Sequence, residues 1–171
     1  MPANPRSLEQ IRSDVTEIAR RLGAPSHQLP LFGSPDDGGR PHIEVVGSTY
    51  QYIVTERGQE LSRQNTECYD ELLYWTFRPI TFWLACDYEL HHRAKGIDSR
   101  RLIFPFQVQL MSEVNPDYRQ LLQREVEAIL KVAPYDDEAT RNLDRILDQQ
   151  SSLGWHKRLL HYLYARIRRL A

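Results

Sequence analysis

Glu89 and His92 are the residues of this sequence whose spacing comes closest to a metal-ligating motif. In a helix, a glutamate and a histidine three positions apart share one face, and di-iron carboxylate proteins use two such pairs. This sequence has only one, and His91 points about 100° away from His92 around a helix. The favoured interpretation is a polar pair near a helix end, so no metal or other cofactor is expected.

Carboxylates recur in the same region and suggest acid–base chemistry. Helical geometry points Asp70 and Glu71 in different directions, where they suit the positive end of a helix dipole. Asp87 and Glu89 are expected to meet arginines, with Arg93, Arg100 and Arg101 as the nearest. The chain has no phosphate-binding loop with its lysine and no GxSxG nucleophile motif. We therefore predict that the protein is not an enzyme.

The segment 155–170 has five Lys or Arg residues, interleaved aromatics and no acidic residue. One interpretation is a surface for phosphate backbones or anionic lipid, which would depend on Arg166, Arg168 and Arg169. Its apolar residues also suit a terminal helix that packs on the core. Packing is favoured, so binding of nucleic acid or of an anionic surface through this basic C-terminal helix is the alternative function.

Composition excludes several classes of protein. The 171 residues are 41% hydrophobic and 26% charged, as in a globular domain, and the net charge of −1 gives no overall attraction to nucleic acid. Neither a signal-peptide pattern nor a membrane-spanning apolar run occurs. Cys68 and Cys86 lie several turns apart on one expected helix, which predicts buried free thiols. We expect a cytoplasmic protein that does not bind membranes.

The N-terminal third predicts one helix and a small sheet. Apolar spacing gives a helix over Leu8–Leu22, with Ser7 as its N-cap and Gly23 as its stop. Residues 24–40 are rich in Pro, Gly and Asp and predict an exposed loop. Residues 41–66 predict a hairpin turning at Gly47–Ser48, with 59–66 as either a third, edge strand or a loop.

Residues 67–171 are expected to be helical. Four helices stand out. One covers 67–95 and is kinked or broken at Pro79, one begins at Asp98, one begins at Asn115–Pro116, and one is capped by Asp136 or Asp137. The predicted fold class is mostly α with a small β-hairpin or three-stranded antiparallel sheet, that is, α+β. Residues 1–171 would form a single-domain helical bundle around the kinked central helix.

Several short motifs follow one another along the chain. They are Tyr52–Gly58 (YIVTERG), Asp70–Trp75 (DELLYW), Ile80–Phe82 (ITF), Tyr88–Leu90 (YEL), Asp98–Arg101 (DSRR) and Pro134–Asp137 (PYDD). In this order they resemble the immunity protein 63 family of bacterial polymorphic toxin systems. The resemblance implies a protein that neutralises a cognate toxin domain by binding it, with no small-molecule substrate.

An immunity protein of this kind is expected to meet a basic toxin cleft through acidic residues. The candidate partner-binding residues are Asp36, Asp37, Glu56, Arg57, Asp70, Glu71, Glu89, Asp136, Asp137 and Glu138. The aromatics between Tyr69 and Tyr88 are too dense for one helical stripe, so most belong to the core and the remainder are candidate anchors for the partner. The oligomeric state is left open.

Overall fold

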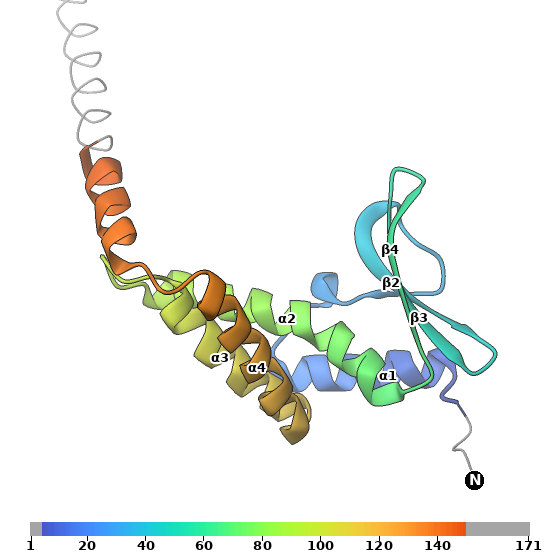
Figure 1. Cartoon of the computed structure of the whole chain (residues 1–171). Coiled ribbons are helices and arrows are strands. Elements are labelled where there is room, and N and C mark those ends of the chain that lie inside the picture. Colours follow the sequence, from blue (N-terminus) through green and yellow to red (C-terminus); the bar gives the residue numbers. More distant parts are fainter. Residues whose placement is uncertain (1–4, 150–171) are drawn as a thin grey trace, which may run out of the picture.

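The computed structural model describes residues 5–149 and shows a sheet at one end joined to a set of helices that extends away from it (Figure 1). The basic segment 155–170, including Arg166, Arg168 and Arg169, lies outside the described residues. The first helix, α1 (Leu8–Leu22), begins at a capping box in which Ser7 and Gln10 bond to each other's backbone N–H groups. Gly23 ends it with φ 74°, as predicted.

The sheet has the strand order β1-β2-β3-β4. Strands β2 (Gly38–Val46), β3 (Thr49–Glu56) and β4 (Gln59–Thr66) are antiparallel, which confirms the hairpin and makes 59–66 a strand. The short β1 (Leu31–Phe32) pairs with β2 in parallel. The sheet is therefore four-stranded and mixed, and the expected hairpin or three-stranded antiparallel sheet is wrong in this detail.

The expected exposed loop over residues 24–40 is also wrong in part. This segment contains the short 3-10 helix η1 (Ser26–Gln28), strand β1 and the start of β2. Leu29 and Pro30 within it are buried. Its turn-forming residues concealed a strand of only two residues, which is too short to show alternation.

Three long helices follow the sheet: α2 (Tyr69–His92), α3 (Arg100–Val114) and α4 (Pro116–Val132), and residues 137–149 are helical as well. Helix α2 continues through Pro79, so the expected break does not occur. Side chains supply extra donors there: the Gln107 amide donates to the Arg78 carbonyl and the Thr81 hydroxyl to that of Phe77. Neither bond replaces the one that Pro79 removes, because that bond would end on the carbonyl of Trp75.

The main core joins α1, the inner face of the sheet and the three long helices. Fully buried members include Ile11, Ile43, Leu72, Phe77 and Met111. The described residues are thus mostly helical with a small sheet, which confirms the α+β prediction. Cys68 and Cys86 are free, but Cys68 is exposed because it precedes the first turn of α2 and does not lie within it.

Candidate protein-binding surface

The candidate residues at the tip of the sheet hold the fold together. Asp37 adopts φ 61°, its carboxylate accepts a hydrogen bond from the Gly58 N–H at 2.6 Å, and its carbonyl accepts one from the Arg57 N–H. Asp36 accepts from the Gly38 N–H. Glu56 is the exposed last residue of β3, and Arg57 is the first residue of the turn between β3 and β4. The two hydrogen bonds to Asp37 tie the 33–37 loop to this turn.

A second group of candidates lies near the C-terminal end of α2. Glu89 is only 3% exposed and receives two hydrogen bonds from the Arg93 guanidinium, both at 2.8 Å. The expected pairing with an arginine is confirmed for Glu89 but not for Asp87, whose carboxylate lies 3.9 Å from His91 Nδ1. A buried, paired carboxylate cannot contact a partner directly, so Glu89 does not belong to an exposed binding surface.

Asp136 and Asp137 are tied to a carboxylate that the candidate set omits, Asp98. Asp98 is 6% exposed and accepts from the Arg100 guanidinium and from the backbone N–H groups of Arg100 and Asp136. The Arg100 guanidinium holds the pKa of Asp98 far below its usual range, and the backbone donors add to this effect. Asp137 accepts from the Asp98 N–H and from Arg101. The neighbouring Glu138 is exposed.

The Glu89–His92 spacing does not form a metal site. The His92 ring stacks on Tyr88 with centroids 4.0 Å apart, and its Nδ1 lies 2.8 Å from the Tyr88 carbonyl, while Glu89 faces Arg93. Within residues 5–149 no three His, Cys, Asp or Glu side chains are arranged to hold a metal ion. In that same range, no helix is long and apolar enough to cross a membrane.

Asp70 and Glu71 differ from the other candidates because they are exposed beside a hollow. This hollow lies between α2 and α4 and has a volume of 530 Å³; we call it the α4-side hollow. Its lining residues are Cys68, Asp70, Glu71, Tyr74, Trp75, Tyr118, Leu121, Arg124 and Glu125. The walls are mainly aromatic and aliphatic, and the charges come from both helices.

Hydrogen bonds fix the walls of this hollow. The Tyr74 hydroxyl donates to Glu125 at 2.7 Å, and Arg78 donates to the second oxygen of the same carboxylate at 2.6 Å. The Tyr118 hydroxyl donates to the Asp70 carbonyl at 2.6 Å, and its ring meets Tyr74 edge-on. Burial raises the pKa of both tyrosines, and for Tyr74 the bond to Glu125 raises it further. Both hydroxyls therefore stay protonated and keep donating.

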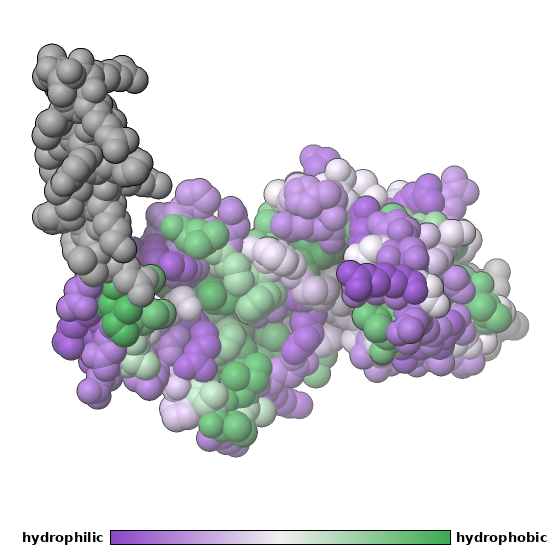
Figure 2. Space-filling view, turned by 90° about the horizontal axis from the view of Figure 1, so that it is seen from above, coloured by the Kyte–Doolittle hydropathy of each residue, from purple (hydrophilic) through white to green (hydrophobic). Residues whose placement is uncertain are grey.

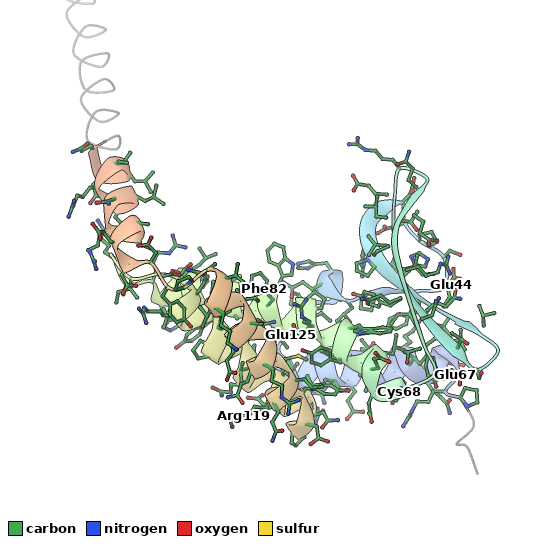
Figure 3. The ribbon with its side chains drawn as sticks, in the orientation of Figure 1. Glu44, Glu67, Cys68, Phe82, Arg119 and Glu125 are labelled. Carbon is green, nitrogen blue, oxygen red and sulfur yellow. The ribbon has the colours of Figure 1, made fainter. Side chains whose placement is uncertain are left out.

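A second hollow, also of 530 Å³, lies on the other side of Trp75 and opens toward the sheet, where Tyr52, Val54 and Gln64 line it. The two hollows share Tyr74, Trp75 and Glu125. Figure 3 shows Cys68 at the start of α2, with Glu125 and Phe82 further along the helices. Phe82 lines a further hollow with Arg78 and Glu125.

These hollows follow one face of α2, which we call the α2 face: Glu71, Trp75, Arg78 and Phe82. The four residues recur at the helical spacing of three or four positions. Phe82 is 42% exposed, and Trp83 beside it is 63% exposed. Of the aromatics between Tyr69 and Tyr88 only Tyr74 and Phe77 are buried, so the expectation that most of them belong to the core holds only in part. Figure 2 shows exposed apolar side chains over the helical part of the molecule.

Sequence reasoning missed the contribution of α4 to this surface. Tyr118, Leu121 and Glu125 recur at helical spacing and could have been grouped on one face. Nothing in the sequence showed that this face lies against Tyr74 and Trp75, which are more than forty positions away.

One comparison with known proteins matches the part of the chain that contains the α4-side hollow. The family model described as immunity protein 63 matches residues 47–128, which include β3, β4, α2, α3 and most of α4. Over residues 47–128, slightly less than half of its 171 residues, the chain is similar to the immunity protein 63 family. No curated protein and no solved structure matches the chain.

The matched segment contains every residue that lines the α4-side hollow and all of the α2 face. The motif at Pro134–Asp137 and the loop with Asp36 and Asp37 fall outside it. A match to an immunity protein family implies a toxin protein as the partner.

Proposed function

We propose that the protein neutralises a cognate bacterial toxin in the cytoplasm by binding it directly through the α2 face. The observation that carries the proposal is that the family-matched segment holds a partly exposed Trp, an exposed Arg and an exposed Phe at helical spacing, bordered by hollows. Aromatic residues and arginine dominate the binding energy of protein interfaces, especially next to pockets that a partner can fill.

The surface also has the rigidity that tight binding requires. Tyr74, Arg78 and Glu125 form one hydrogen-bonded set between α2 and α4, so little side-chain freedom is lost when a partner docks. The two acidic residues nearest the hollow, Asp70 and Glu71, would speed association with a basic toxin. The protein acts by occupying the toxin surface and carries out no reaction of its own.

Co-expression with the C-terminal domain of the cognate toxin tests the function, and we expect the gene immediately upstream to encode that toxin. Cells that make both proteins should grow, and the two should co-purify as a stable complex. Death of cells that contain abundant folded protein would show that the proposed function is wrong.

The variant Phe82→Ala tests the surface. Loss of an interface aromatic should weaken binding by about 2 kcal/mol, which is roughly thirtyfold in Kd. Val132→Ala is the matched control, because Val132 is an exposed apolar residue (89%) that lines none of these hollows. Calorimetric titration of both variants should show a loss for Phe82→Ala alone; equal affinities would place the toxin elsewhere.

A further inference from the structure

The α4-side hollow has a surface that suits the stem of a long side chain. Tyr74 and Tyr118 are buried, and Trp75 is partly exposed. Leu121, which is 44% exposed, extends the apolar wall on the α4 side. Apolar walls of this kind bind methylene groups, while the mouth of the hollow stays open to solvent.

The charge of the lining is negative. Asp70, Glu71 and Glu125 give −3 and Arg124 gives +1, so the lining carries −2, whereas the whole chain of 171 residues carries only −1. The Glu125 carboxylate already accepts from Tyr74 and Arg78. Glu71 accepts from the Thr66 hydroxyl through one oxygen, and Asp70 is exposed at the mouth. Asp70 and Glu71 are therefore the carboxylates best placed to receive a cation.

An arginine side chain matches these features better than other side chains. Its guanidinium is planar, stacks on aromatic rings such as Trp75, and donates to two carboxylates at once. It is also less strongly hydrated than the ammonium group of lysine, so an aromatic-walled hollow costs it less. An acidic side chain would be repelled by Asp70 and Glu71.

Building on the proposed function, we propose that the α4-side hollow receives an arginine side chain of the toxin. Its stem packs against Leu121 and Tyr118, its guanidinium stacks on Trp75, and Asp70 and Glu71 accept its hydrogen bonds. Asp70 and Glu71 then form a specific contact with this arginine, in addition to any general attraction to a basic toxin.

Neutralising the two carboxylates tests the contact. The double variant Asp70→Asn, Glu71→Gln keeps an acceptor for the Thr66 hydroxyl and removes both charges. Its affinity for the cognate toxin domain should fall at least tenfold, and binding should depend less on salt. The control Glu9→Gln, Glu17→Gln makes the same change of charge on exposed residues of α1 and should bind like the parent.

Arginine-to-glutamate substitutions across the toxin then locate the partner residue. One of them should weaken binding to the parent protein, and Asp70→Arg should restore binding to that toxin variant alone. Replacing the same toxin arginine with lysine should also weaken binding; full affinity with lysine would overturn the assignment to a guanidinium.

The two proposals fail in different ways. If the parent protects cells and the double variant binds with the parent's affinity and salt dependence, the arginine contact is wrong and the function stands. If the parent itself neither binds nor protects, the proposed function is wrong.

Discussion

Both ends of α2 carry carboxylates, but Asp70 and Glu71 at one end are exposed, whereas Glu89 at the other is buried and hydrogen-bonded. At the N-terminal end, Asp70 and Glu71 are exposed beside a hollow that Trp75 and Leu121 help to line. At the C-terminal end, Glu89 is buried and bound by Arg93, and Asp98 just beyond it receives several hydrogen bonds. One end can offer its charges to a partner, and the other uses them within the fold.

This difference shows that the role of a carboxylate depends on how many donors surround it in the folded chain. A carboxylate that is saturated with protein donors stabilises the fold and has little left for a ligand. One with free acceptor capacity at the edge of a hollow contributes little to folding and is available for recognition. Substitutions at the two ends should therefore separate stability from binding.

The largest effect on stability is expected for Asp98→Ala. The change leaves Arg100 and the Asp136 N–H without their acceptor at the junction between α3 and the segment after α4. Breaking such a set of charge-assisted bonds should lower the free energy of unfolding by about 3 kcal/mol. Urea denaturation measures it, and a loss below about 1 kcal/mol would contradict a structural role for this end.

Glu89→Ala should have a smaller effect, about 1–2 kcal/mol, because Arg93 is exposed enough to remain hydrated after its partner is lost. The same denaturation measurement checks it. Toxin binding should not change, since Glu89 is buried. A loss of affinity without a loss of stability would mean that Glu89 contacts the toxin after all.

Acid should weaken the fold through Asp98. Its pKa is lowered in the folded protein, whereas an unfolded aspartate titrates near about 3.9. Below that value the unfolded chain takes up a proton that the folded protein does not, so stability present at neutral pH is lost as the pH falls toward the folded pKa. Unfolding free energies between about pH 5 and pH 2 should therefore fall less steeply for Asp98→Asn than for the parent.

The smallest effect on stability is expected for Asp70→Asn, which should change the free energy of unfolding by no more than about 0.5 kcal/mol. The exposed side chain lies at a helix N-terminus where either residue is tolerated. A thermal melt of this variant beside Asp98→Ala compares the two ends directly. A large loss for Asp70→Asn would mean that both ends serve the fold.

Local signals predicted most of the helical architecture. Ser7, Gly23, Asn115 and Pro116 act as expected, because caps and first-turn prolines depend on neighbours within a few residues. Strand β1 could not be predicted, since its two residues depend on pairing with His42 and Ile43. The hydrogen bond from the Gln107 amide to the Arg78 carbonyl likewise joins two helices that the sequence does not place together.

The candidate surface was only partly predictable for the same reason. Acidic residues could be identified from the sequence, but their exposure and partners could not, so Glu89 was grouped with Asp70 and Glu71. The structure divides the candidates into those held by the fold, such as Asp37 and Asp137, and those at the α4-side hollow. Leu121 and Arg124 entered the surface only through the packing of α4 against α2.

The contact between Asp37 and the β3–β4 turn has a consequence for how the tip of the sheet opens. The amide protons of Arg57 and Gly58 lie in an exposed turn, yet both are bonded to Asp37. They can exchange with deuterated solvent only when the 33–37 loop lifts away. Their exchange rates therefore measure the free energy of this local opening, separately from the unfolding of the helices.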